Sequence, residues 1–324
     1  MLLLDQEFVR DHLTVEACIP LVREAMIALS AGQTLQPLRS VLHLAEGRAF
    51  GVMPGAMAGD AVFGAKLVSV YPENFAQGRP SHQGVITLFD PDNGAPSALV
   101  HAGEVTRIRT ACASAAATDV LARPDATRLA VLGYGEQARA HVAAMAAVRS
   151  LSEVRVWGRS PDRARAFATD LQAEHAIPVE AVREGREAVR DADIICTVTA
   201  AAEPILISEW VSDGTHINAV GSSYAGPVEI APDLVARSRF LADYGPGVLA
   251  QGAEFLAAKQ AGLIDDSHVV GEIGQVFAGT LKGRTRPDQV TVYKSLGHVV
   301  QDLACASWLV DQARRRGGGV EVAF

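Results

Sequence analysis

The chain is poor in cysteine, in aromatic residues and in long apolar runs. Its 324 residues include four cysteines, whose wide spacing gives neither a C-x-x-C pair nor a metal-binding pattern: Cys18, Cys112, Cys196 and Cys305. We therefore expect reduced thiols in the core of a cytoplasmic protein, with no metal. No apolar run reaches membrane length, and Asp5 interrupts the N-terminus. We expect neither a membrane-spanning helix nor a secretory signal.

A sustained basic run is also missing. The formal net charge is −8, and the short Arg314-Arg315-Arg316 cluster falls in the last turns of an expected helix, where cations favour the helix dipole. This argues against a nucleic-acid partner. The composition, with 49% hydrophobic and 20% charged residues, is typical of a globular protein, and the length favours two domains.

The most informative stretch is residues 127–160, which contain a glycine-rich turn. An apolar run at 129–132 leads into Gly133-Tyr134-Gly135-Glu136-Gln137-Ala138, an alanine-rich helical run follows to Val148, and a second apolar run occupies 154–157. Gly133 permits a tight turn, Gly135 lets the backbone approach a pyrophosphate, and Ala138 lets helix and strand pack closely. The pattern predicts a dinucleotide-binding βαβ unit with the phosphates at the helix start, beside Glu136 and Gln137.

The end of the second strand indicates which nucleotide binds. An NAD-preferring site usually has Asp or Glu there, and this chain has neither between Val154 and Pro161. It has Arg159, Ser160 and Arg163, whose side chains suit a 2′-phosphate. We therefore predict that NADP(H) is preferred and that NAD(H) remains an option; the alternative is a solvated arginine. Trp157 either covers the adenine or fills the core.

The first part of the chain predicts an α+β module. We expect helices at 14–30 and 104–122, and strands within 38–53 joined at Glu46-Gly47-Arg48, at 62–71, and in a hairpin at 84–90 and 96–101. Pro124 marks the crossing into the nucleotide domain. A final helix at 295–316 should return to the first module. The domains are then 1–122 plus 295–324 for substrate binding and dimerisation, and 123–294 for the nucleotide.

The nucleotide domain is predicted to be a Rossmann doubly wound α/β sheet. Helices are expected at 161–174 and 184–191, and strands at 177–180, 193–198, 216–220 and 240–243. Ligands in such sheets bind beyond the carboxyl ends of the strands, so residues Thr197–Thr199 and Val220–Ser223 should face the cofactor.

Three cationic residues in the first module occupy unusual contexts. Lys66 lies within an apolar strand, Arg39 follows Pro37-Leu38, and Arg109 lies in a helix of small residues. Lys and Arg are rarely buried without a partner, so together they indicate an anion site, most simply for a carboxylate. We expect them to face the reactive end of the cofactor. Taken singly, each is more often a solvated side chain.

The chain resembles the ornithine cyclodeaminase/mu-crystallin family over nearly its whole length. The resemblance rests on motifs in the family's order: Met53-Pro54-Gly55, Gly64-Ala65-Lys66-Leu67-Val68, Ser81-His82-Gln83-Gly84, Arg109-Thr110-Ala111, Gly133–Ala138, Trp157–Ser160, Thr197-Val198-Thr199 with Glu203-Pro204-Ile205-Leu206, His216–Gly221, Tyr293-Lys294-Ser295-Leu296-Gly297 and Gln301-Asp302. It implies a Rossmann domain plus an N-terminal dimerisation and substrate domain completed by the C-terminal helix, and a homodimer.

The resemblance also implies an activity. Cyclodeaminases of this family carry an Asp where this chain has Ser223, and serine is a poor general base without help. The ketimine reductase branch is more similar, which implies NAD(P)H-dependent reduction of 1-pyrroline-2-carboxylate to L-proline or of 1-piperideine-2-carboxylate to L-pipecolate. The alternatives are an ornithine cyclodeaminase, an amino-acid dehydrogenase, and an NADPH-loaded binding protein for small ligands.

Residue roles follow from the resemblance. Arg39 and Arg109 would clamp the substrate carboxylate, and either Lys66 or Glu272 would supply the proton. Ser81 and His82 would contact cofactor or substrate. The further cofactor contacts that we expect are Arg109, Thr110, Trp157, Gly158, Thr197, Val198, Thr199, Val220, Ser222, Lys294 and Ser295.

Overall fold

The computed structural model describes residues 1–45, 47–57, 59 and 61–323, which form two compact units. The first comprises Met1–Arg109 and His298–Phe324, and the second comprises Thr110–Gly297. The division falls inside helix α3 (Ala102–Leu121), whereas the sequence analysis places it at Pro124. The second half of α3 joins the second unit because its buried polar side chains bond there, Ser114 with His141 and Thr118 with Asn218.

The first unit is built on an eight-stranded sheet in the order β16-β1-β7-β6-β5-β4-β2, with β3 paired to β4. Its strands are β1 (Leu2–Leu4), β2 (Thr34–Leu35), β3 (Ser40–Ala45), β4 (Arg48–Met57), β5 (Val62–Val70), β6 (His82–Phe89), β7 (Pro96–His101) and β16 (Val320–Glu321). All pairs are antiparallel except β1 with β7. The strands predicted from the sequence are confirmed; in the predicted turn before β4, Glu46 lies outside the described residues.

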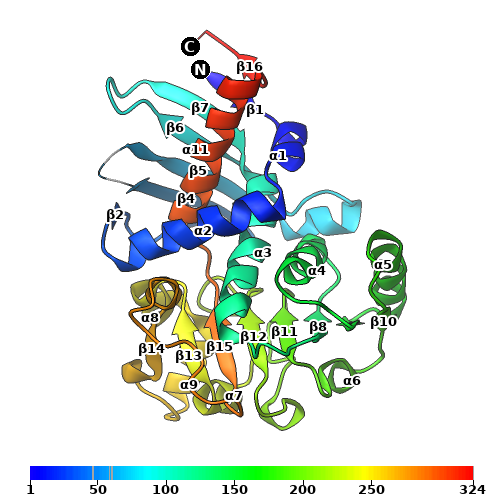
Figure 1. The fold of residues 1–324 in the computed structure, drawn as a ribbon. Helices are drawn as coiled ribbons and strands as arrows, with labels where there is room; N and C mark the ends of the chain where they lie inside the picture. The colour runs from blue at the N-terminus through cyan, green and yellow to red at the C-terminus, as the bar shows by residue number, and fades with distance from the viewer. Residues whose placement is uncertain (46, 58, 60, 324) are drawn as a thin grey trace. The chain divides into compact units, whose positions relative to one another are not determined.

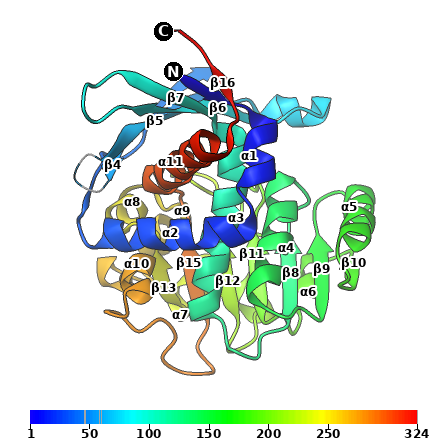
Figure 2. The same ribbon diagram turned by 45° about the horizontal axis from the view of Figure 1, so that its top comes forward.

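Helices cover one face of this sheet. They are α1 (Gln6–His12), α2 (Val15–Ser30) and α11 (Val299–Arg316), with a 3-10 turn η2 (Pro72–Gln77) at the edge. Helix α11 packs on β4, β5 and β6 with α2 beside it (Figures 1 and 2). Thr14 caps α2 as its position predicts, because its hydroxyl accepts from the Ala17 amide. Helix α11 begins at Val299, later than predicted, because His298 adopts an extended conformation and caps it.

The second unit holds an all-parallel sheet in the order β10-β9-β8-β11-β12-β15-β13-β14. Its strands are β8 (Arg128–Leu132), β9 (Glu153–Trp157), β10 (Val179–Ala181), β11 (Ile194–Thr197), β12 (His216–Ala219), β13 (Arg239–Ala242), β14 (Val269–Glu272) and β15 (Thr291–Lys294). The chain runs outward from β8 to β10 and then resumes at β11 on the other side of β8. This reversal is the Rossmann topology that the sequence predicts, and in sheets of this kind a ligand is expected beyond the carboxyl ends of the strands at the reversal, here β8 and β11.

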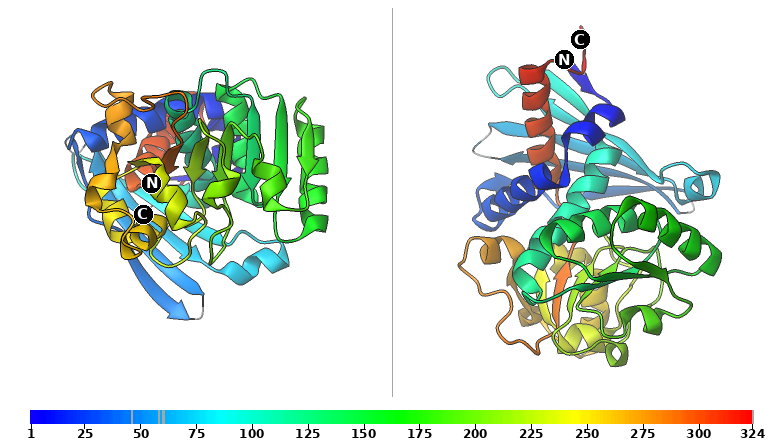
Figure 3. Two further views of the ribbon diagram at one scale, coloured as in Figure 1. Left: turned by 90° about the horizontal axis from the view of Figure 1, so that it is seen from below. Right: turned by 45° about the vertical axis from the view of Figure 1, so that its right-hand side comes forward.

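Helices flank both faces of the parallel sheet (Figure 3). They are α4 (Glu136–Val148), α5 (Pro161–Glu174), α6 (Gly185–Val189), α7 (Pro232–Arg237), α8 (Gly245–Gln251), α9 (Ala253–Gln260) and α10 (Ile273–Phe277), with 3-10 turns η3 (Ser208–Trp210) and η4 (Asp266–His268). Ile195, Ile217, Phe240, Val292 and Phe255 belong to its fully buried core. The apolar strands therefore hold their carboxyl ends, where the candidate site lies, in fixed register.

Two exclusions from the sequence can be compared with the structure. No helix among the described residues is both long and apolar enough to cross a membrane. All four cysteines are buried free thiols, as the sequence analysis expects.

Candidate functional site

The glycine turn between β8 and α4 has the geometry that a pyrophosphate requires. Gly133 has φ +133° and donates its amide to the Trp157 carbonyl, and a Cβ there would lie 2.9 Å from the Val198 carbonyl oxygen. Space next to Gly135 is open, because no atom lies within 4 Å of the point that a Cβ would occupy. Gly135 is also the N-cap of α4 and offers no side chain to cap it. The first amides of α4 are therefore left for an anionic ligand.

The residues around this turn are placed as the sequence predicts. Ala138 is fully buried in α4, which allows the close approach of helix and strand. Glu136 is exposed in the first turn, and Gln137 is half-buried. The side-chain oxygen of Gln137 is buried and has no hydrogen-bond partner among the described residues. An orphaned buried oxygen beside an uncapped helix start indicates that a polar ligand belongs there.

Tyr134 is a site residue that the sequence analysis gave no role. A Cβ on Gly158 would lie 2.2 Å from the Tyr134 ring, so Gly158 is what allows this ring to pack over the end of β9. Trp157 is half-buried and packs against the core cluster of the second unit. This contact gives Trp157 a part in core packing, and a contact with the adenine stays a prediction.

Arg159, Ser160 and Arg163 surround the start of α5. Both arginines are exposed, and the Ser160 hydroxyl caps the helix by accepting from the Arg163 amide at 3.4 Å. A phosphate at this position would meet two guanidinium groups at a positive helix end.

Two loops follow the carboxyl ends of β11 and β12, and we call residues 197–199 and 220–223 the edge loops. Thr197 and Ser222 are buried, whereas Val198, Thr199 and Ser223 are half-buried. The Val220 amide donates to the Thr197 carbonyl, which joins the two loops. The Ser222 hydroxyl is buried without a hydrogen-bond partner in the described chain, as is that of Ser295, which follows β15.

Lys294 lies at the end of β15 and is completely buried. Its ammonium is 2.6 Å from the Glu254 carboxylate and donates to the Ser222 carbonyl at 2.6 Å. A direct contact with cofactor stays a prediction for Lys294. The structure shows that Lys294 holds the edge loop 220–223 through its bond to the Ser222 carbonyl.

In the first unit, Lys66 and Arg109 both bind the buried carboxylate of Asp302. The Lys66 ammonium lies 3.2 and 3.3 Å from the two oxygens, and Arg109 Nε donates at 2.9 Å. Arg109 Nη1 also donates to the side chain of Gln301 at 2.7 Å. The closing Gln301-Asp302 motif thus supplies the counter-charge, a role that the sequence did not indicate for it.

These charged groups shift one another's pKa values. Burial lowers the pKa of the Lys66 ammonium to about 8; Asp302 opposes this shift, and Arg109 and Arg39 add to it. Burial together with Arg39 also lowers the pKa of His298 to about 4, so this ring is neutral near pH 7. The charges of Arg39, Lys66 and Arg109, which we call the cation cluster, therefore act on one region, and their role as an anion site stays a prediction.

The structure also shows the surroundings of four other predicted site residues. Ser81 and His82 stand at the start of β6, where the Ser81 hydroxyl lies 3.0 Å from His82 Nδ1. Thr110 is buried in α3 next to Arg109. Glu272 accepts from the Gly245 amide at 2.8 Å and forms a capping box with Gln275 at the start of α10. These contacts give Glu272 a structural role, and its role as a proton donor stays a prediction.

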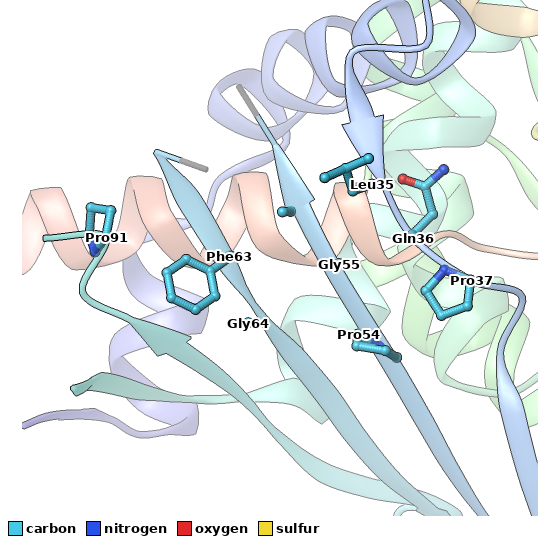
Figure 4. Close-up of a pocket in the computed structure, with 9 residues that line it drawn as sticks. Leu35, Gln36, Pro37, Pro54, Gly55, Phe63, Gly64 and Pro91 are labelled. Atoms are coloured by element: carbon cyan, nitrogen blue, oxygen red, sulfur yellow. The ribbon is translucent and has the colours of Figure 1, made fainter. Parts of the chain in front are cut away.

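An open cavity of about 650 Å³ lies elsewhere in the first unit, on the sheet (Figure 4). Apolar groups dominate its lining, which comprises Leu35, Gln36, Pro37, Pro54, Gly55, Ala56, Phe63, Gly64 and Pro91. The cation cluster is not among these lining residues. None of the described residues in its lining carries a charge, which makes the cavity a poor candidate for a carboxylate site.

Comparison with known proteins gives a matching family and named relatives. The ornithine cyclodeaminase/mu-crystallin family matches residues 1–317. Ketimine reductase mu-crystallin from Mus musculus is 36% identical over 313 residues, which are 95% of this chain and 96% of that protein. A Delta(1)-pyrroline-2-carboxylate reductase from Bacillus cereus is 32% identical over 326 residues, and the match covers 100% of both chains.

Two solved structures are similar to this chain over almost its whole length. That of Thermococcus litoralis Delta(1)-pyrroline-2-carboxylate reductase, in complex with NADH and L-proline, has a TM-score of 0.96 and 32% identity, covering 99% of this chain and 100% of the other. An archaeal alanine dehydrogenase dimer with bound NAD has a TM-score of 0.93 and 27% identity, covering 100% and 99%.

Proposed function

The chain belongs to the ornithine cyclodeaminase/mu-crystallin family, and from this premise we propose that it reduces cyclic ketimine carboxylates with a nicotinamide cofactor. The coarser assignment, an NAD(P)-dependent oxidoreductase of this family, follows from the relatives and from the Rossmann unit. The proposed substrates are 1-pyrroline-2-carboxylate, reduced to L-proline, and 1-piperideine-2-carboxylate, reduced to L-pipecolate. The observation that carries this proposal is the cation cluster around Asp302 in the first unit.

The residues of the second unit fit a dinucleotide. The open space at Gly135 and the uncapped start of α4 suit the pyrophosphate. The unpartnered hydroxyls of Ser222 and Ser295 lie at the strand ends, where a Rossmann sheet receives its ligand. When bound, the reduced nicotinamide supplies a hydride.

The cation cluster is proposed to bind the substrate carboxylate. Arg109 is fixed by Asp302 and Gln301 through Nε and Nη1, which leaves Nη2 for the substrate. Arg39 adds a second guanidinium whose charge acts on the same region. A carboxylate held in this way fixes the adjacent imine carbon, so that hydride transfer becomes a positioned step.

Lys66 is proposed to provide the proton for the ring nitrogen. Reduction adds a hydride to the imine carbon and a proton to the nitrogen, which gives the cyclic secondary amine. An ammonium whose pKa is about 8 is mostly protonated at neutral pH and still gives up its proton readily. Asp302 keeps the ammonium in place throughout this transfer.

NADPH is proposed as the preferred reductant, with NADH as a second option. The support is Arg159 with Arg163 at the start of α5, and no acidic side chain at the end of β9. The related structures named above hold NADH or NAD. A direct comparison of the two cofactors is therefore the decisive measurement.

We also propose a homodimer formed by the open face of the first sheet. Lys66 faces α11, so side chains at the alternate positions of the strands point to the other face of the sheet. At these positions Leu67 pairs with Val85, and Phe50 pairs with Leu42. Leu42 is 57% exposed and Leu44 54%. A second copy of the chain is the favoured occupant, because a similar structure is a dimer.

The function is tested by the oxidation of NADPH and of NADH with five- and six-membered cyclic imino acids. The same protein is assayed with proline, ornithine and alanine plus the oxidised cofactors. Turnover of an imino acid is expected. Ammonia release from ornithine would indicate a cyclodeaminase, turnover of alanine alone a dehydrogenase of open-chain amino acids, and binding without any turnover a ligand-binding protein.

A further inference from the structure

Glu229 is a completely buried acid in the second unit that the sequence analysis did not single out. It follows the edge loop 220–223 and precedes α7. Its main-chain carbonyl accepts from the amides of Ile205 and Leu206 at 2.9 and 3.0 Å, next to an isolated bridge between Leu206 and Ile230. The backbone of Glu229 is therefore anchored independently of its side chain.

The Glu229 carboxylate holds both edge loops. One oxygen accepts from the amide and from the hydroxyl of Thr199, each at 2.7 Å, and the other accepts from the Gly221 amide at 2.7 Å. Thr199 ends the loop after β11, and Gly221 lies in the loop after β12. One side chain thus fixes the spacing of two segments that follow separate strands.

A second buried acid completes this arrangement. Glu254 accepts from the Glu229 amide at 3.2 Å and pairs with Lys294, which in turn donates to the Ser222 carbonyl. The edge loop 220–223 is therefore held at Gly221 by Glu229 and at Ser222 by Lys294. Burying two carboxylates is costly, and burial raises the pKa of Glu229. Such a costly arrangement in the core indicates a requirement for exact placement of the loops.

The Thr199 hydroxyl is fully engaged within the protein. It donates to Glu229 and accepts from the Ala201 amide at 3.1 Å. By contrast, the hydroxyl of Ser222 is buried without a partner in the described chain. The Thr199 hydroxyl therefore shapes the loops, whereas that of Ser222 is among those that remain for a ligand.

We propose that Glu229 is a positioning residue that sets the two edge loops for the nicotinamide end of the cofactor. This inference rests on the proposed function for the identity of the cofactor and the direction of hydride transfer. Glu229 does not touch the reacting atoms. It acts through the Thr199 and Gly221 amides, whose orientation it fixes before the cofactor binds.

The test is Glu229→Gln in the full-length protein. Glutamine keeps the size of the side chain, but its amide group must face one of the backbone amides that now donate to the carboxylate. One loop is expected to shift, with a rise of about tenfold in the dissociation constant of NADPH and a fall of about a hundredfold in the rate of hydride transfer. Calorimetry gives the first quantity, and single-turnover reduction with 4-deuterated NADPH gives the second.

Asp193→Asn is the matched control. Asp193 is also a buried carboxylate that accepts from two backbone amides, those of Thr127 and Arg128, but it lies at the amino ends of the strands. The Asp193→Asn variant should lose thermal stability as Glu229→Gln does, but it should keep its affinity for NADPH. A wild-type-like Glu229→Gln, or equal losses of affinity in both variants, would overturn the proposal.

Thr199 provides a second pair of variants, which keeps the test valid if Glu229→Gln does not fold. Thr199→Val removes the hydroxyl bond to Glu229, and Thr199→Ser retains it. A several-fold weaker binding of NADPH is expected for valine only, and equal affinities would contradict the proposal. If the wild-type protein reduces neither imino acid, the proposed function fails, while calorimetry with NADPH still decides the role of Glu229.

Discussion

The ammonium of Lys66 lies 3.2 Å from the carboxylate of Asp302, and both side chains are almost completely buried. Lys66 comes from the middle of β5, and Asp302 from the first turn of α11. Burial penalises each charge, and the pairing compensates for part of the penalty. The consequence is an ammonium with a lowered pKa in a fixed position, which is the property that a proton donor needs.

Lys66→Met is expected to abolish most imine reduction, by a factor on the order of 10²–10⁴, because the ring nitrogen loses its proton donor. Cofactor affinity should change little, since the glycine turn belongs to the second unit. Steady-state rates and calorimetry with NADPH measure the two effects. Lys282→Met, which changes an exposed lysine of the second unit, is the matched control and should retain full activity. Unchanged turnover in Lys66→Met would remove Lys66 from the mechanism.

The pH dependence follows from the lowered pKa of Lys66. Reduction needs the protonated ammonium, so kcat/KM for the imino acid should fall as the pH rises through about 8. The reverse oxidation of the amine needs neutral Lys66 and should rise over the same range. Initial rates in both directions between about pH 6 and pH 10 measure this. Parallel profiles in the two directions would show that another group controls the proton.

Asp302→Asn should destabilise the first unit by about 3–5 kcal/mol, because it leaves Lys66 and Arg109 buried without their counter-charge. In the wild type, burial raises the pKa of Asp302, but Arg109 and Lys66 outweigh it and hold the pKa below 3.8. The stabilisation is therefore complete above pH 3.8 and is lost as the pH falls through the folded-state pKa. Urea unfolding measures the change. Asp311→Asn, exposed on the same helix, should have no effect; equal stability of both variants would refute a charge-paired core.

Arg159→Asp should reverse the preference between NADPH and NADH. The carboxylate repels a 2′-phosphate and can accept from ribose hydroxyls, so KM should rise by about tenfold or more for NADPH and fall for NADH. The control is Arg286→Asp, an exposed arginine before the amino end of β15. If Arg159→Asp keeps the wild-type ratio of the two kcat/KM values, then Arg159 does not read the phosphate.

Leu42→Lys should dissociate the proposed dimer, since it places a charge on the apolar outer face of the first sheet. Analytical ultracentrifugation measures the mass. Leu263→Lys is the control, because Leu263 is similarly exposed but lies in the second unit. A wild-type protein that sediments as a monomer, or a dimeric Leu42→Lys, would argue against this face as the interface.

The sequence predicted the elements with strong periodicity and missed those that depend on distant partners. Helix α5 begins and ends where predicted, because Ser160 and Pro161 give a complete start signal. The pairing of β1 with β16 joins the two ends of the chain, and strands of three and two residues carry no readable pattern. The cation cluster was predictable because Lys66 interrupts an apolar strand.

The two buried acids that hold the edge loops, Glu229 and Glu254, were harder to predict for a physical reason. An isolated Glu in a loop, such as Glu229, is usually solvated, and only the fold reveals that three donors converge on it. Lys294 was assigned to the cofactor from its motif, whereas its partner Glu254 lies 40 positions earlier, in a helix with no warning pattern. Motifs therefore indicated the candidate site, and the fold showed which buried acids hold the edge loops.

The discontinuity of the first unit has a consequence for biosynthesis. Strands β1 to β7 and α2 precede the second unit in the chain, but Asp302 and the rest of α11 follow it. The second unit is continuous and can complete its core while translation proceeds. Until α11 emerges from the ribosome, Lys66 and Arg109 lack the Asp302 carboxylate that neutralises them. A chain that ends before α11 should therefore lose the counter-charge of the proposed substrate site while keeping an intact nucleotide fold, which makes truncation before α11 a severe form of damage for this protein.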